Sequence, residues 1–147
     1  MAPQKLTGWL ILLIVILVLS LGSVGATFRR TDQVFQSYLA DHPAVGTALM
    51  VYKLFGGAAV CASLYTAWVL FRRDPGTLRL AKSFLIVRCL LITVSGFSVP
   101  VLAGLAPEAT QRMIVQATYG SLVSMLFTAI WFAYLSRSER VAKIYAA

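Results

Sequence analysis

The sequence predicts an all-α membrane protein, a bundle of four antiparallel transmembrane helices. Of its 147 residues, 59% are apolar and only 12% are charged, whereas a soluble domain is about half apolar and about a quarter charged. A soluble core of this size cannot hide so much apolar surface, and a chain in lipid must pair its own backbone polar groups, which favours helices. Because the length suits one domain, we expect residues 1–147 to form a single four-helix unit.

Four uncharged apolar stretches run from Leu6 to Phe28, from Leu54 to Phe71, from Cys89 to about Ala106 and from Met113 to Ser136. From them we expect spans at about residues 7–28, 49–71, 83–105 and 113–136, followed by a tail at 137–147. Each stretch is close to the ~20 residues that cross a ~30 Å hydrocarbon core as a helix. The first also has features of a cleavable signal peptide, but its apolar character continues to Phe28, which favours a retained anchor. Asp74-Pro75-Gly76 is typical of a tight reversal between the second and third spans. Pro107 followed by Glu108 predicts that the fourth helix begins there.

The longest gap between spans, from Arg29 to Pro43, is expected to form the first outer loop. Four of its apolar residues fall on one side of a helix, namely Val34, Phe35, Tyr38 and Leu39. This spacing predicts a short amphipathic segment that lies on the membrane surface.

Basic residues predict the orientation of the bundle. One side of the membrane receives eight of the 13 Lys and Arg residues, namely Lys5, Arg72, Arg73, Arg79, Lys82, Arg137, Arg140 and Lys143. The other side receives Arg29, Arg30 and Arg112. The positive-inside rule therefore places both termini in the cytoplasm.

Lys53 and Arg88 are the ionisable residues that lie at or inside the expected spans, and such residues are functional candidates. Neither has an acidic partner within the predicted membrane region, so each is a candidate contact for an anionic ligand or a lipid headgroup. The simpler interpretation, which we favour, is that both side chains reach to the headgroups and anchor the bundle.

Two further groups of residues are candidates for contacts. In the tail, the residues expected to meet the membrane surface or a partner are Arg137, Arg140, Lys143 and Tyr145. Inside the spans, the residues expected to form a helix-packing face are Gly57, Gly96, Gly120 and Ser124. Small residues let helices approach closely in lipid, where no hydrophobic force drives association. A polar ligand path is the alternative role for this face.

The acidic residues, the single histidine and the two cysteines exclude several function classes. All five acids fall outside the expected spans, which argues against a proton-coupled antiporter. His42 lies in the expected outer loop, so paired histidine ligands for haem are lacking, and Cys61 and Cys89 are too few for a dithiol oxidase. No catalytic or nucleotide-binding motif is present. We expect no enzyme activity, no cofactor, no metal site and no nucleic-acid partner.

Two motifs resemble those of a known family. Gly8-Trp9-Leu10 opens the first helix, and Trp131-Phe-Ala-Tyr134 followed by Ser138-Glu-Arg140-Val141 closes the last. With the turn that begins Phe71-Arg72-Arg73, the chain resembles a family of four-helix bacterial inner-membrane proteins classed only as a domain of unknown function. The last residues, Ala142-Lys143-Ile144-Tyr145, depart from the family's usual ending. The resemblance implies a multi-pass protein of the bacterial inner membrane and no particular activity.

These observations predict an accessory, assembly or interaction subunit of a larger membrane complex. Its partners are expected to be membrane lipids and either a membrane protein or a second copy of the chain. The alternative is a binder or carrier of a lipid or another anionic amphipathic molecule, which Arg88 or Lys53 would hold between the helices.

Overall fold

The computed structural model describes residues 8–39, 42–72 and 76–145, which form helices and no strand. Four helices are long, namely α1 (Gly8–Phe35), α2 (Pro43–Arg72), α3 (Thr77–Leu102) and α4 (Pro107–Arg137). A short helix, α5 (Glu139–Tyr145), follows them. Each long helix is apolar and long enough to cross a membrane. The prediction of four helices able to span a membrane is therefore confirmed. Lys5, Arg73 and the Asp74-Pro75 pair lie outside the described residues.

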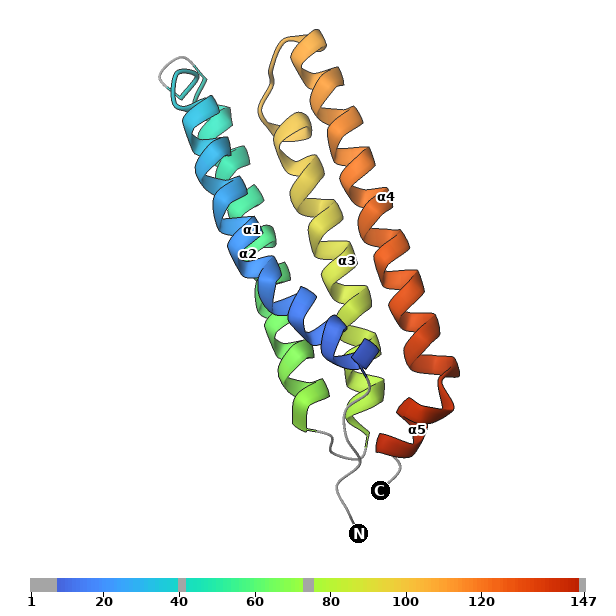
Figure 1. The fold of residues 1–147 in the computed structure, drawn as a ribbon. Coiled ribbons are helices and arrows are strands. Elements are labelled where there is room, and N and C mark those ends of the chain that lie inside the picture. Colours follow the sequence, from blue (N-terminus) through green and yellow to red (C-terminus); the bar gives the residue numbers. More distant parts are fainter. Residues whose placement is uncertain (1–7, 40–41, 73–75, 146–147) are drawn as a thin grey trace.

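The long helices run up and down, and each packs on the next in the sequence (Figure 1). The most extensive contact is between α2 and α3, followed by those of α3 with α4 and of α1 with α2. The start of α1 lies at the same end of the bundle as α5 (Figure 1). The first turns of α1 lie beside α3 and run obliquely from there to α2, which the rest of α1 follows (Figure 1).

The connections use residues suited to turns. Gly76, immediately before α3, and Gly104, between α3 and α4, have φ of 84° and 62°, which glycine adopts without a steric penalty. The fourth helix begins at Pro107 with Glu108 in its first turn, as predicted. Pro107 suits this position because the first N–H groups of a helix have no intrahelical partner.

The predicted surface segment in the first loop is wrong. Instead, α1 continues without interruption for 28 residues to Phe35, and residues 36–39 form a turn. An ion pair fixes this extension to α2, because Lys53 Nζ lies 2.7 Å from a carboxylate oxygen of Asp32. Asp32 therefore belongs to a helix rather than to a loop. At ~1.5 Å per residue α1 is about 42 Å long, so it is longer than a ~30 Å hydrocarbon core.

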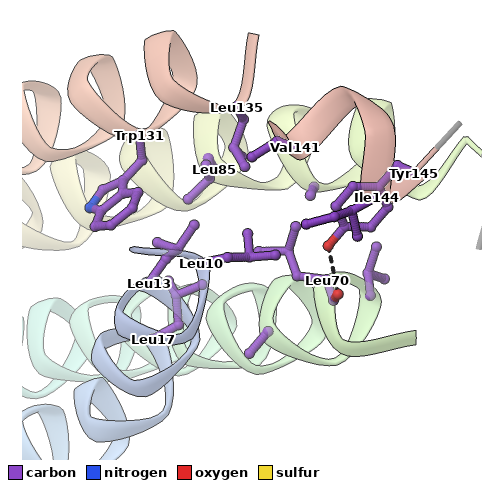
Figure 2. Close-up of a cluster of buried hydrophobic side chains, with 13 residues drawn as sticks. Leu10, Leu13, Leu17, Leu70, Leu85, Trp131, Leu135, Val141, Ile144 and Tyr145 are labelled. Carbon is purple, nitrogen blue, oxygen red and sulfur yellow. Dashed lines mark hydrogen bonds between the residues drawn. The ribbon is translucent and has the colours of Figure 1, made fainter. Parts of the chain in front are cut away.

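The end of the bundle that includes α5 is filled by a core to which every helix contributes (Figure 2). We call this end the packed half; its largest buried side chains are Leu10, Leu13, Leu17, Leu70, Leu85, Trp131, Leu135, Val141, Ile144 and Tyr145. The buried hydroxyl group of Tyr145 donates a 2.6 Å hydrogen bond to the Leu70 carbonyl. Because α2 ends at Arg72, this carbonyl is among those that the helix leaves without a backbone partner. Tyr145 thus ties α5 to the end of α2.

The opposite end has a smaller core, formed by α1, α2 and the end of α3. Its buried side chains are Phe35, Val45, Ala48, Leu49, Val99 and Ala103. Between this cluster and the packed half the helices enclose a space that side chains do not fill.

Candidate functional site

A cavity of about 430 Å³ lies among the four long helices. Residues of α1 from Ser20 to Phe35 line one side, and residues of α4 from Met113 to Ser121 line another. The lining of α2 and α3 reaches from Ser63 and Arg88 to the smaller core at the opposite end. We call this part of the bundle the hollow half. Its volume falls within the ~300–1,000 Å³ that is typical of small-molecule sites.

The course of α1 creates the cavity. In its first turns α1 approaches α4, where the rings of Trp9 and Trp131 lie 6.4 Å apart. Farther along, α1 packs on α2 while α4 packs on α3 (Figure 1). The space beside Gly120 on α4 is open, because a Cβ added there would have no neighbour within 4 Å. The space between α1 and α4 is therefore not filled from either side.

Arg88 is the one charged side chain among the described residues that line the cavity. Its Nε donates a 2.8 Å hydrogen bond to Ser63 Oγ. The guanidinium carbon lies 5.0 Å from the centre of the Phe127 ring, within the range of a cation–π contact. Its Nη1 is buried and has no hydrogen-bond partner among the described residues. A buried donor atom of this half-buried cation is therefore unpaired.

The hydroxyl group of Ser121 on α4 continues this polar surface. Ser121 lines the cavity and is 6% exposed, and its Oγ has no hydrogen-bond partner among the described residues. Ser124 and Thr128, farther along the same helix, are also buried without a partner for their hydroxyl oxygen, but they do not line the cavity. Buried polar atoms are nearly always hydrogen-bonded in proteins, so unpaired groups at a cavity mark a place suited to a polar ligand.

Lys53, the second ionisable candidate, is placed differently from Arg88. It pairs with Asp32, and the two side chains are 42% and 49% exposed. We expected no acid beside Lys53, but the helical extension of α1 brings Asp32 to it. Its charge is compensated, and Lys53 is not among the residues that line the cavity. Arg88 and Lys53 therefore do not form one site.

A ladder of hydroxyl groups on α1 lines the cavity opposite α4, and the sequence analysis did not identify it. Its members are Ser20, Ser23, Thr27 and Thr31. Their spacing of three, four and four residues places them on one face of a helix. That spacing is visible in the sequence, so the ladder could have been found by asking which face of the first span is polar.

The small residues expected to form a packing face have different surroundings. A Cβ on Gly96 would lie 3.6 Å from Ala117, and Ser124 is buried. A Cβ on Gly57 or Gly120 would have nothing within 4 Å. The close approach in α2 falls one residue earlier, at Gly56, where a Cβ would lie 2.7 Å from the Phe28 ring. Gly120 therefore lines the cavity and takes no part in a close helix contact.

The tail residues separate into two groups. Arg137, Arg140 and Lys143 are exposed. Tyr145, which we placed with them at the surface, is instead buried in the packed half with its hydroxyl group on α2. Its ring is therefore unavailable to a partner in this conformation. The three exposed basic residues at this end, Arg137 of α4 and Arg140 and Lys143 of α5, lie beside the exposed Glu139.

Comparison with known families finds one match that covers nearly the whole chain. The family model described as "Protein of unknown function (DUF2569)" matches residues 3–146. The chain belongs to this family. The resemblance to an uncharacterised family is thus confirmed, and no curated protein and no solved structure matches the chain. In this DUF2569 protein the motifs that carried the resemblance, at residues 8–10, 131–134 and 138–141, all belong to the region of the packed half.

Proposed function

We propose that this protein binds an anionic amphipathic molecule in the cavity of the hollow half, with the anionic group held by Arg88. The observation that carries the proposal is the buried, unpaired Nη1 of Arg88, a residue that lines the cavity. The sequence suggested this function as the alternative to an accessory role, and the geometry supports it better than that role.

The energetics of a buried charge support an anionic ligand. A charged side chain near the middle of a membrane costs about 2.5–3.5 kcal/mol or more. Arg88 offsets part of this cost through Ser63 and the Phe127 ring. No carboxylate of the described residues lines the cavity, so the guanidinium has no counter-charge there. A phosphate or carboxylate group of a ligand would supply the charge and accept the free donor.

The shape of the cavity supports an amphipathic molecule. The α1 wall and Ser121 provide polar groups, while Phe28, Ile92 and Val99 provide apolar surface. The unfilled space between α1 and α4 faces lipid if the helices span a membrane. An acyl chain can leave the site there while its headgroup stays near Arg88.

The orientation predicted from the basic residues completes the proposal. With both termini in the cytoplasm of a bacterial cell, the packed half lies on the cytoplasmic side of the inner membrane. The cavity then occupies the outer half of the bilayer. A molecule held there would come from the outer leaflet.

Lipid binding to purified protein tests the proposal. Native mass spectrometry would measure the affinity for phosphatidylglycerol, which is anionic, and for phosphatidylcholine, which has no net charge. We expect wild type to prefer phosphatidylglycerol and Arg88→Gln to bind it about 10- to 100-fold more weakly, which corresponds to the loss of a charge-assisted hydrogen bond. Gln can still donate to Ser63, which limits damage to the fold.

Lys53→Gln is the matched control, because it removes a cation that lies outside the cavity. Its affinity for phosphatidylglycerol should equal that of wild type. Equal losses in both variants would indicate attraction by overall charge and would contradict the proposal. So would an Arg88→Gln protein that keeps the wild-type affinity.

An interaction role is a second candidate, which the exposed basic residues of the tail favour. Arg137 at the end of α4 and Arg140 and Lys143 of α5 are exposed, and Tyr145 fixes α5 to the bundle. A fixed basic surface suits anionic headgroups or an acidic partner. Replacing Arg140 and Lys143 by Glu should then release a co-purifying partner without changing the melting temperature. If the same proteins co-purify with this variant as with wild type, the interaction role is contradicted.

A further inference from the structure

The hydroxyl ladder of α1 identifies the class of headgroup that the cavity takes. Each member donates its hydroxyl hydrogen to its own helix, over distances of 2.6–2.9 Å between the oxygen atoms. The acceptors are the carbonyls of Leu17, Ser20, Ser23 and Thr27. A hydroxyl group has one donor and two acceptor lone pairs. Toward the cavity, these four side chains can therefore act mainly as hydrogen-bond acceptors.

The opposite side of the cavity presents donors. Arg88 Nη1 is unpaired, and Ser121, which is 94% buried, has a free hydroxyl group. A ligand that satisfies both sides must carry an acceptor, such as a phosphate oxygen, and also groups that donate hydrogen bonds. A simple anion meets the first condition and not the second.

The two sides lie at matching levels of the bundle. Phe28 of α1 lies against Gly56 of α2. Seven residues beyond Gly56 is Ser63, which accepts the hydrogen bond from Arg88. Because α1 and α2 are antiparallel, Ser20 lies at about this level, and Ser23 and Thr27 follow in steps of about one helical turn, ~5.4 Å. A headgroup whose phosphate is on Arg88 can thus reach Ser23 and Thr27.

Lipid headgroups carry two kinds of hydrogen-bond donor, ammonium groups and hydroxyl groups, and the charge of the cavity favours one of them. An ammonium group would add a second positive charge to a cavity whose described lining has Arg88 and no carboxylate. A zwitterionic headgroup would then leave the charge of Arg88 uncompensated in a region of low polarity. A phosphodiester joined to a polyol carries one negative charge and donates through its hydroxyl groups. It balances the charge of Arg88 and supplies donors to the ladder.

We infer that the ligand is a lipid whose headgroup joins a single phosphodiester to a polyol, with the phosphate on Arg88 and the polyol hydroxyl groups on Ser23 and Thr27. This inference rests on the proposed function and narrows it to one headgroup chemistry. Phosphatidylglycerol is the simplest lipid of this class.

A comparison of two lipids of equal charge tests the inference. Phosphatidylglycerol and phosphatidylmethanol both carry one phosphodiester charge, but only the first has hydroxyl groups on its headgroup. In nanodiscs of phosphatidylcholine that contain equal amounts of both, native mass spectrometry would measure the ratio in which they bind. We expect wild type to prefer phosphatidylglycerol by about fivefold for each hydrogen bond to the ladder.

Variants of the ladder provide the second measurement. The double variant Ser23→Ala, Thr27→Val removes two acceptors and keeps Arg88, so it should bind both lipids about equally and still prefer them to phosphatidylcholine. Thr118→Val is the matched control. Thr118 makes the same kind of bond to its own helix, from Oγ1 to the Ile114 carbonyl at 2.8 Å, but does not line the cavity. It should retain the full preference of wild type.

The outcomes separate this inference from the function on which it rests. If wild type binds the two anionic lipids equally and both more tightly than phosphatidylcholine, the polyol class is overturned and the anion site at Arg88 stands. If neither anionic lipid is preferred to phosphatidylcholine, the proposed function itself fails. A preference for phosphatidylethanolamine added as a third lipid would overturn the argument from charge. Equal preference in wild type and the double variant would overturn the role of Ser23 and Thr27.

Discussion

The packed half and the hollow half are built on the same inward-facing stripe of α1. In the packed half this stripe consists of Leu10, Leu13 and Leu17, which are fully buried. One turn later the same stripe continues with Ser20, and of the six further α1 residues that line the cavity three carry a hydroxyl group, namely Ser23, Thr27 and Thr31. The change from leucine to serine and threonine coincides with the point where α1 leaves the core shared by all five helices.

Under the proposed function, this difference assigns stability to one end of the bundle and binding to the other. In lipid, close packing and hydrogen bonds hold helices together, and burial of apolar surface adds little. Leucine side chains fill the space between helices, whereas serine and threonine hydroxyls bond to their own backbone and leave the space open. The packed half is therefore expected to determine stability, and the hollow half to determine binding.

The largest expected effect comes from truncating a leucine of the packed half. Leu17→Ala should lower the free energy of unfolding by about 2–5 kcal/mol, because it leaves a cavity in a filled core. Titration with a denaturing detergent in mixed micelles would measure this change. Leu19→Ala is the control, since Leu19 is 67% exposed on the outer face of the same helix and its truncation should have a much smaller effect. Similar losses for the two variants would contradict the distinction between filled core and lipid-facing surface.

Adding volume should have opposite consequences in the two halves. Ala67 is buried in the packed half, so Ala67→Phe should cost about 1–3 kcal/mol of stability through overpacking. Gly120→Phe should cost none, because a Cβ at Gly120 meets nothing within 4 Å. It should nevertheless abolish the retention of phosphatidylglycerol, because the ring enters the cavity. Thermal melting and native mass spectrometry would measure the two effects, and a Gly120→Phe protein that still binds the lipid would argue against the site.

Loss of the tie between α5 and α2 should have an intermediate effect. Tyr145→Phe removes the hydrogen bond to the Leu70 carbonyl and should lower the free energy of unfolding by about 0.5–1.5 kcal/mol. Tyr119→Phe is the matched control, because Tyr119 is 71% exposed. Hydrogen exchange of residues 139–145 would show whether α5 opens first. Unchanged exchange in Tyr145→Phe would mean that the hydrogen bond does not hold α5.

The smallest effect is expected at the ion pair of the α1 extension. Lys53→Gln should change the free energy of unfolding by at most about 1 kcal/mol, because exposed ion pairs contribute little. The difference from wild type should shrink as salt is added. A loss of several kcal/mol that salt does not reduce would show that this pair matters as much as the packed half.

Much of the fold follows from composition, because the spacing of charges determines where apolar helices begin and end. Pro107 marked the start of α4 correctly, and Arg88 stood out because it interrupts an apolar stretch. The end of α1 was missed, since hydropathy falls after Phe28 whereas the helix continues. No helix-breaking residue intervenes there, and Asp32 finds a partner on α2.

The details of the site depend on how each helix is rotated about its axis. The sequence does not reveal this rotation, because the helices carry apolar residues on every side. Gly56 and Gly57 are equally small, and only the position of the Phe28 ring shows which one allows the close approach. Tyr145 is both polar and apolar, and its burial depends on the fold of the tail onto α2. The ladder of α1 was predictable in principle, because its spacing is regular. Its function was not, because a line of hydroxyl groups faces either a neighbouring helix or a cavity.

Residue-level photocrosslinking tests most directly whether the hollow half is a binding site. Phosphatidylglycerol that carries a photoreactive group beside its phosphate would be incorporated into nanodiscs with the protein, and crosslinked residues would be identified by mass spectrometry. The account predicts labelling of cavity residues such as Ser23 and Ser121 that excess unmodified phosphatidylglycerol suppresses and that Arg88→Gln lacks. Labelling confined to lipid-facing residues such as Leu19 and Leu122, unchanged by the competitor and by the variant, would contradict it.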